Sequence, residues 1–234
     1  MTARTVRVEH CMGTVFSFDV RGDGDWEPAL DAAVAELHLI DWVFSTYRED
    51  SDISRIRRRE LPAAQAHPLV GEVLELCARA QERTRGYFSA LAAGAIDPTG
   101  LVKGWAIQRA SDVLRAAGAR DHCVNGGGDV VACGHPKPGR DWTVGIVDPL
   151  DRSRTIATVE VSDAAVATSG TSERGEHLID PFTRRPAVTD LLSATVIGPS
   201  LTFADAFATA AFVMGRAEAT RWIAGVPGYR VLLT

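Results

Sequence analysis

The chain has 234 residues, of which 46% are hydrophobic and 24% are charged, enough apolar material for one large domain or two small ones. Its formal net charge of −5 argues against general nucleic-acid binding, which needs a basic surface. Residues 55–59 (RIRRR) form the only dense basic run. We interpret this run as a solvated surface patch rather than a phosphate-binding segment.

The four cysteines, Cys11, Cys77, Cys123 and Cys133, form no CxxC pair, which argues against zinc sites and thioredoxin-like chemistry. Each lies among apolar neighbours and is interpreted as a small core residue. The opening residues contain no apolar run long enough for a signal peptide, and no stretch has transmembrane length. We therefore expect a cytoplasmic protein with reduced thiols and no membrane segment.

The N-terminal part is predicted to begin with two strands and to continue with helices. The strands cover residues 5–9 and 14–20, on either side of the turn-like Cys11-Met12-Gly13. Apolar residues then recur at helical spacing, which predicts two helices with a polar loop over residues 45–54 between them. These helices cover residues 26–44 and 68–84.

The remainder is predicted to consist mostly of strands, with two further helices. The helices cover residues 103–117 and 203–214, ended by Gly118 and Gly215. Strand-like runs cover residues 123–124, 129–133, 142–147, 155–161, 164–168, 192–197 and 229–233. Helices thus cluster early and strands late, which predicts an α+β fold with a largely antiparallel sheet and flanking helices.

A glycine-rich segment, Asn125-Gly126-Gly127-Gly128-Asp129, follows a short apolar run. Consecutive glycines allow backbone N–H groups to approach an anion closely. The segment matches neither a Walker A loop, because no Lys-Ser/Thr follows, nor a dinucleotide-binding loop, because a strand-like pair follows. It is interpreted either as a tight strand connection or as a phosphate cradle.

A second segment, residues 97–104, leads from a loop with Asp97 into the helix predicted to begin at Lys103. Helix N-termini attract anions through their free N–H groups and dipole, so a lysine placed there suggests a negative ligand nearby. An exposed lysine and an N-capping acid would account for the same residues equally well.

A third segment joins the hydroxyl-rich residues 168–172 to the run His177-Leu178-Ile179-Asp180-Pro181. Small hydroxyl side chains offer hydrogen bonds to a ligand, and His177 could act as an acid or base near neutral pH. A lone histidine is more often a structural or surface residue. The chain lacks a G-x-S-x-G elbow, which disfavours a hydrolase triad.

Asp205 and Thr209 lie one turn apart on one face of the last predicted helix. A carboxylate and a hydroxyl suit Mg²⁺ when phosphate oxygens and water complete the shell. Taken alone, the pair is better interpreted as an acid on the helix dipole and a threonine bonded to its own backbone.

Together and in this order, these segments resemble the ApbE family, the FAD:protein FMN transferases. The resemblance runs over about residues 11–215. The motifs that carry it are Met12-Gly13-Thr14, Phe44-Ser45-Thr46-Tyr47-Arg48, Asp50-Ser51, Ile53-Ser54, Asp97, Lys103-Gly104, residues 125–129, Thr168-Ser169-Gly170, residues 177–181 and residues 205–209.

The resemblance implies a single ApbE-like, T-fold-like domain over residues 1–234 with a central FAD cleft. The implied enzyme moves FMN from FAD to a Thr or Ser hydroxyl of an acceptor protein and releases AMP. Asp205, Thr209 and a loop carbonyl near Gly100 would hold Mg²⁺, and His177 would be the catalytic base. The implied FAD-binding residues are Met12, Tyr47, Ser89, Ala90, Leu91, Asp97, Lys103, Asn125, Gly127, Asp129, Thr168, Ser169, Gly170 and Ile179.

The chain departs from the family pattern in two places. Gln108 stands where the family commonly has an acid, and residues 86–97 form a shorter segment that lacks the usual Phe-Asp-Pro-Thr-like element. We expect residues 89–91 to replace that element at the flavin. Two alternatives use the same residues: an FAD pyrophosphatase that releases FMN and AMP, and a non-catalytic FAD-binding protein.

Overall fold

The computed structural model describes residues 3–170 and 178–234. The predicted base His177 lies outside the described residues. The helices are α1 (Glu27–Phe44), α2 (Asp52–Arg57), α3 (Pro68–Arg83), α4 (Thr99–Ala116) and α5 (Leu201–Ile223), with a 3-10 turn at Ala63–Gln65. The strands are β1 (Arg4–Cys11), β2 (Thr14–Arg21), β3 (Asp121–Gly126), β4 (Asp129–Cys133), β5 (Trp142–Val147), β6 (Thr155–Val161), β7 (Ala164–Gly170), β8 (Ile179–Asp180), β9 (Arg185–Pro186), β10 (Ser193–Gly198) and β11 (Arg230–Leu233).

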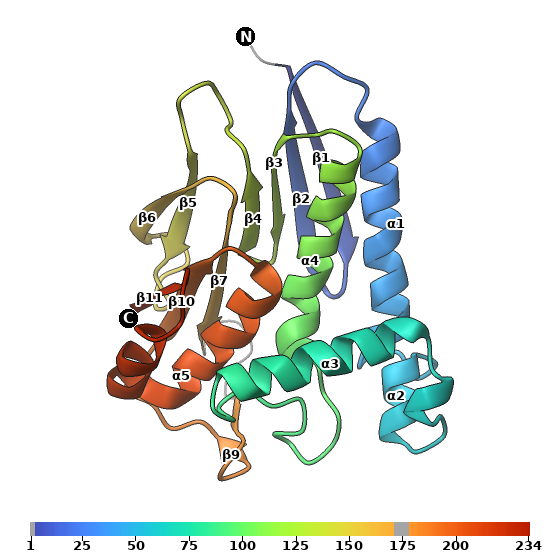
Figure 1. Cartoon of the computed structure of the whole chain (residues 1–234), viewed down its shortest axis with the longest axis vertical. Helices are drawn as coiled ribbons and strands as arrows, with labels where there is room; N and C mark the ends of the chain where they lie inside the picture. The colour runs from blue at the N-terminus through green and yellow to red at the C-terminus, as the bar shows by residue number, and fades with distance from the viewer. Residues whose placement is uncertain (1–2, 171–177) are drawn as a thin grey trace.

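Seven strands form one sheet in the order β1-β2-β3-β4-β7-β10-β11, and every neighbouring pair is antiparallel. Two small antiparallel sheets, β5-β6 and β8-β9, accompany it. In Figure 1, α1, α4 and α5 cover one face of the large sheet, while α3 runs across their lower ends. The predicted α+β class with a largely antiparallel sheet is confirmed.

The large sheet buries side chains on both faces. Phe16 and Phe18 on β2 are fully buried in the core beneath the helices. On the opposite face, Val130 and Val166 join a second buried cluster with Trp142 from β5. The β5-β6 pair therefore covers β4, β7 and β10 on this face, and it leaves valines of β1 and β2 exposed.

Two helical segments differ from the predictions, and in each case a side chain that accepts a hydrogen bond from a helix N–H group accounts for the difference. The predicted loop over residues 45–54 contains the start of α2, because the Ser51 hydroxyl accepts a hydrogen bond from the Ser54 N–H at 3.1 Å. Gly215 does interrupt the last helix, with φ of 72°, but residues 216–223 continue as helix. Asp190 makes this possible by accepting a hydrogen bond from the Arg216 N–H at 3.0 Å.

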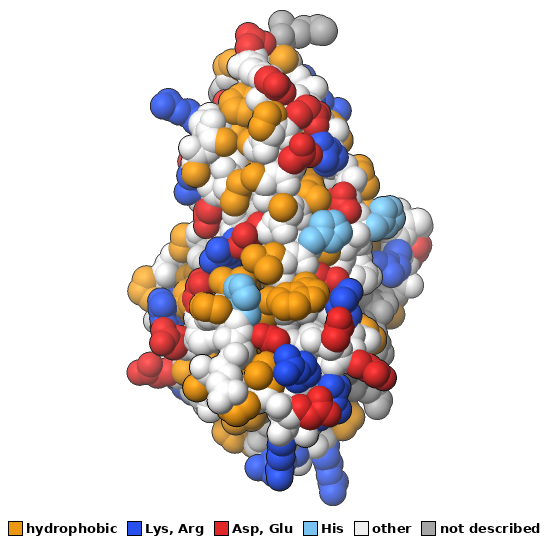
Figure 2. Space-filling view, turned by 90° about the vertical axis from the view of Figure 1, so that its right-hand side faces the viewer, with side chains coloured by type: hydrophobic (Ala, Val, Ile, Leu, Met, Phe, Trp, Pro, Cys, Tyr) orange, Lys and Arg blue, Asp and Glu red, His pale blue; other side chains and the backbone are white. Residues whose placement is uncertain are grey.

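Basic and acidic side chains are intermixed on the side of the molecule seen in Figure 2, and no extended basic patch interrupts them. Within the basic run, Arg58 binds Glu60 at 2.7 Å and Arg55 lies 3.8 Å from Asp52. These pairs fit the interpretation of the run as a solvated patch. No helix among the described residues is long and apolar enough to cross a membrane.

Candidate active site

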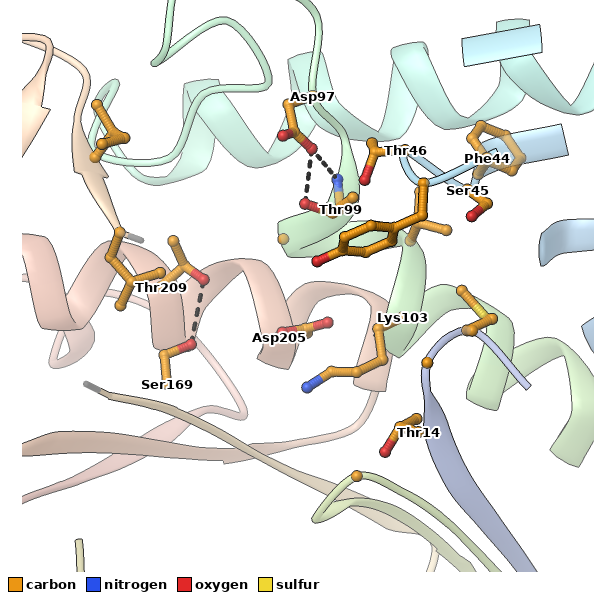
Figure 3. A pocket seen from close by; sticks show the side chains of 18 of the residues that line it. Thr14, Phe44, Ser45, Thr46, Asp97, Thr99, Lys103, Ser169, Asp205 and Thr209 are labelled. Atoms are coloured by element: carbon orange, nitrogen blue, oxygen red, sulfur yellow. Dashed lines mark hydrogen bonds between the residues drawn. The ribbon is translucent and has the colours of Figure 1, made fainter. Parts of the chain in front are cut away.

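A cavity of about 470 Å³ opens where the start of α4 meets α5, the end of β7 and the β1-β2 turn. Figure 3 shows hydroxyl, carboxylate and ammonium groups converging on it from these elements. The predicted site residues on its wall are Met12, Tyr47, Asp97, Gly100, Lys103, Gly127, Thr168, Ser169, Gly170, Ile179, Asp205 and Thr209. The fold thus gathers residues separated by almost 200 positions in the chain.

Some predicted site residues lie elsewhere. The cavity wall does not include Ser89, Ala90 or Leu91. It does include the next two residues, Ala92 and Ala93. The reason is local: the Asp97 N–H donates to the Ala90 carbonyl at 2.7 Å, and this contact folds the segment into a compact turn. Asn125 and Asp129 line an adjoining cavity instead.

Sequence reasoning missed several wall residues. Asp41 and Val102 line the cavity from the end of α1 and the start of α4. Thr14, Phe44, Ser45 and Thr46 line it as well; they belong to the motifs that carry the family resemblance, but no role was predicted for them. Asp41 could have been suspected, because it is a carboxylate on the last turns of a largely apolar helix.

Asp205 is held at the wall by a close approach of α4 and α5. Its side chain is only 4% exposed, and its Oδ2 accepts a hydrogen bond from the Gly104 N–H at 2.9 Å. A Cβ at Gly104 would lie 2.7 Å from both Asp205 Cβ and the Leu201 carbonyl. Only glycine allows this approach, so Gly104 positions the carboxylate.

Thr209 lies one turn further along α5. Its hydroxyl is 3.2 Å from that of Ser169, as Figure 3 shows, and it is 3.7 Å from the position a Cβ would take at Gly100. In a regular helix the Gly104 N–H donates to the carbonyl of Gly100. Asp205 also accepts from that N–H, so the Gly100 carbonyl and the Asp205 carboxylate are expected beside the same backbone group.

The described residues contain no group of three or more His, Cys, Asp or Glu side chains that could hold a metal. A cation at Asp205 would therefore need other oxygen ligands. A hydroxyl, a carbonyl and the phosphates of a ligand are the ligands that Mg²⁺ accepts beside a single carboxylate. The donor set at Asp205, Thr209 and Gly100 fits this requirement.

Lys103 lies one turn inside α4, so the prediction that it begins the helix is wrong. The helix begins at Thr99, whose N–H and hydroxyl donate to Asp97 Oδ1 at 3.1 and 2.7 Å. Lys103 instead reaches Asp129, with 2.7 Å between Nζ and Oδ2. The Asp129 carboxylate is almost fully buried and also accepts from the Thr168 N–H at 3.0 Å, so it joins α4, β4 and β7 beside the cavity.

Two tight turns lie side by side at the cavity. Met12-Gly13 connects β1 to β2, and Gly127-Gly128 connects β3 to β4, each as the two-residue turn of a β-hairpin. All four residues have positive φ, as type I′ turns require. The Gly127 N–H donates to the Val15 carbonyl at 3.2 Å, which links the turns. The glycine-rich segment is thus a tight strand connection, and Gly127 also lines the cavity.

Met12 is unusual because it is a non-glycine residue with φ of 52°. The left-handed conformation costs about 1–2 kcal/mol for a residue that carries a Cβ. Such strain concentrates at ligand sites, where surrounding structure maintains it. The position of Met12 on the cavity wall agrees with that pattern.

Gln108, where the sequence departs from the family pattern, lies away from the cavity wall. Its side-chain carbonyl accepts from the Leu201 N–H at 3.0 Å and thereby caps α5, the helix that carries Asp205. A carboxylate would accept the same bond. The departure therefore keeps the cap that fixes the start of α5.

The sequence profile of the ApbE family matches residues 12–94 and 90–233. Among curated proteins, the chain is similar to the FAD:protein FMN transferases of Vibrio cholerae, at 33% identity over 129 residues, and of Treponema pallidum, at 32% over 154 residues. These alignments cover 51% and 58% of this chain but only 39% and 42% of the relatives.

Solved structures match over nearly the whole chain. The flavin transferase ApbE from Vibrio cholerae has a TM-score of 0.84 at 20% identity and covers 100% of this chain and 98% of its own. The apbe protein from Thermotoga maritima has a TM-score of 0.87 at 21% identity and covers 99% and 94%. At these identities the matches establish the fold.

Proposed function

The chain belongs to the ApbE family, and from this premise we propose that it is an FAD:protein FMN transferase. It would move the FMN moiety of FAD to a Thr or Ser hydroxyl of an acceptor protein and release AMP. The observation that carries the proposal is the convergence of Asp205, Thr209, Gly100 and Lys103 on one cavity.

The cavity suits an anionic donor. Its volume lies within the range of small-molecule sites. The first turn of α4 lines it through Thr99 and Gly100, so the positive end of the helix dipole faces a bound pyrophosphate. Lys103 lies at the same wall with its ammonium paired to Asp129, and Tyr47, 83% exposed at the rim, offers a ring face for stacking on FAD.

Asp205, Thr209 and the Gly100 carbonyl would hold Mg²⁺ beside the pyrophosphate. When bound, the cation neutralises the pyrophosphate and the charge that develops at phosphorus. Gly104 keeps the Asp205 carboxylate in place, because its N–H donates to Oδ2. Ser169 orients the Thr209 hydroxyl from β7.

The acceptor hydroxyl is a weak nucleophile and needs a base. We assign this role to His177. The described residues that follow it in the chain, Leu178 and Ile179, line the cavity. In the reaction the acceptor oxygen bonds to the FMN phosphorus, the bond to AMP breaks, the proton passes to His177 and AMP leaves.

The test incubates the chain with FAD, Mg²⁺ and a peptide that contains an Asp-Gly-Ala-Thr or Ser-Gly-Ala-Thr sequence. Fluorescent flavin that stays on the peptide through denaturing electrophoresis supports the transfer. Free FMN without an adduct would assign the chain as an FAD pyrophosphatase. Bound FAD with neither product would make it a non-catalytic FAD-binding protein.

A further inference from the structure

A second cavity, of about 800 Å³, adjoins the candidate active site. The two cavities share five wall residues, which lie in the β1-β2 and β3-β4 turns, at the start of β2 or on β7: Gly13, Thr14, Gly127, Thr168 and Gly170. We call the second cavity the β5 groove, because residues 143–147 of β5 form one of its walls. A chain lying in the β5 groove would have one end at the active site.

The floor of the β5 groove is the sheet face that lacks helices. Val15 and Ser17 on β2 alternate with Phe16 and Phe18, which point into the helix-covered core. Strand pairing places Cys123 and Asn125 of β3 on the same face as Val15 and Ser17. This floor is a mixed surface of small apolar and polar side chains, with Val15 45% exposed.

The β5 wall presents a strand edge. Val144 and Ile146 pack toward the large sheet, whereas Thr143, Gly145 and Val147 face outward. All five residues nevertheless border the groove. A strand that presented one face would contribute only alternate residues, so the consecutive run indicates that the backbone edge of β5 faces the groove.

This edge is open among the residues that the structure describes. β5 pairs with β6 on its other side, and no further described strand pairs with it. An unpaired strand edge offers a row of N–H and C=O groups to an incoming extended chain. Peptides bind such edges by adding a strand, and alternate side-chain contacts then give specificity.

We propose that the β5 groove binds the acceptor protein as an extended segment, which adds to the edge of β5 and carries its Thr or Ser into the active site. The inference rests on the proposed function and names the surface that recognises its second substrate. The shared turns Met12-Gly13 and Gly127-Gly128 form the passage between the two cavities.

The composition of the groove favours a bound peptide over a portion of FAD, the anionic donor. The charged wall residues of the groove are Asp129, Asp148 and Arg152. The helix N-terminus and Lys103 belong to the first cavity. An extended peptide, whose backbone is neutral, needs no positive charge and can pair with the backbone groups of the β5 edge.

The test compares two exposed valines on the same sheet face. Val15, 45% exposed, lines the groove, while Val6, 51% exposed on β1, does not. Val15→Arg should raise the KM for the Ser-Gly-Ala-Thr peptide by ~10-fold, about 1.4 kcal/mol, with kcat and FAD affinity unchanged. Ser17→Trp should act in the same direction, and Val6→Arg should leave all three values as in the wild type.

Binding of the fluorescein-labelled peptide, followed by anisotropy, tests the groove independently of turnover. Both groove variants should weaken it, and the Val6 variant should not. Unchanged peptide affinity in Val15→Arg and Ser17→Trp would overturn the inference. Weakened FAD affinity in these variants would also overturn it, because the groove would then hold the FAD donor. A wild-type chain that binds the peptide in the groove without forming an adduct would refute the proposed function alone.

Discussion

At the scale of single residues, the proposed metal binding depends on two oxygen groups, of Asp205 and Thr209, that α5 places one turn apart. Asp205 is buried and bonded to the Gly104 N–H, whereas Thr209 contacts Ser169 across the cavity. Helical spacing alone is compatible with a metal, but it fits an acid on the helix dipole and a backbone-bonded threonine better. Burial of the carboxylate at a cavity wall, beside the start of α4, distinguishes the pair from that simpler arrangement.

Thr209→Val removes the hydroxyl and keeps the side-chain shape. We expect Mg²⁺-dependent turnover to fall ~10–100-fold, because one oxygen ligand is lost, and Thr209→Ser should retain most of the activity. Asp205→Asn should cost more than ~100-fold, or about 2.7 kcal/mol of transition-state stabilisation. Initial rates over a Mg²⁺ titration check these values. Equal activity of the valine and serine variants would remove Thr209 from the metal site.

A buried polar cluster lies apart from the cavity, at the other end of α4. Cys133 Sγ is 3.0 Å from Arg115 Nη2 and 3.4 Å from Ser111 Oγ, and Ser111 Oγ is 2.7 Å from His122 Nε2. Burial raises the pKa of the Cys133 thiol, but interactions with His122, Ser111 and Arg115 outweigh burial, and the pKa lies below its ordinary value. The thiolate form is thus stabilised by folding.

The stability that this shift contributes is present above the unfolded thiol pKa of about 8.5 and is lost as the pH falls through the folded pKa. Cys133→Ala should therefore destabilise the protein more at pH 9 than at pH 6 in urea unfolding. Cys77 is the control, because burial raises its pKa to about 12. The cost of Cys77→Ala should shrink at pH 9, and the same trend in both variants would contradict the assignment.

At the scale of elements, the packing of α4 against α5 positions the proposed metal ligands. The two helices are in close contact at Gly104, where a Cβ would lie 2.7 Å from Asp205 Cβ and from the Leu201 carbonyl. Gln108, one turn further along α4, caps the start of α5. The backbone geometry of one helix therefore sets the orientation of the carboxylate carried by the other.

Gly104→Ala should separate the helices, destabilise the fold by about 1–3 kcal/mol and weaken Mg²⁺ binding measured by calorimetry with FAD present. Gly71→Ala, on the exposed face of α3 with no atom within 4 Å of the new Cβ, is the matched control. It should stabilise the protein by about 0.5–1 kcal/mol through helix propensity. Equal effects of the two changes would show that the close approach at Gly104 is unimportant.

Helices with strong apolar periodicity were predictable from the sequence, whereas α2 and the helical residues after Gly215 were not. The predicted ranges 26–44 and 68–84 agree with α1 and α3 within one residue. The short helix α2 carries little apolar periodicity and begins at the cap of Ser51. The helical residues after Gly215 depend on Asp190, which lies 26 positions away from Arg216, and local patterns do not report such a partner.

At the scale of the whole molecule, the sheet order decides which segments meet. β7 pairs with β4 and β10, and this pairing brings residues 168–170 beside the turns at Met12 and Gly127. The sequence suggested the antiparallel sheet but not this order. The motifs shared with the ApbE family therefore suggested most of the residues that gather at the cavity, while Asp41, the passage to the β5 groove and the edge of β5 required the fold.

The central claim is that the chain transfers FMN to a protein hydroxyl rather than hydrolysing FAD. Intact-mass spectrometry of the acceptor peptide, combined with quantification of released AMP, measures both outcomes in one reaction. We predict an acceptor heavier by one FMN group and one AMP per adduct, both dependent on Mg²⁺ and on Asp205. AMP and free FMN without any change in the acceptor mass would contradict the account.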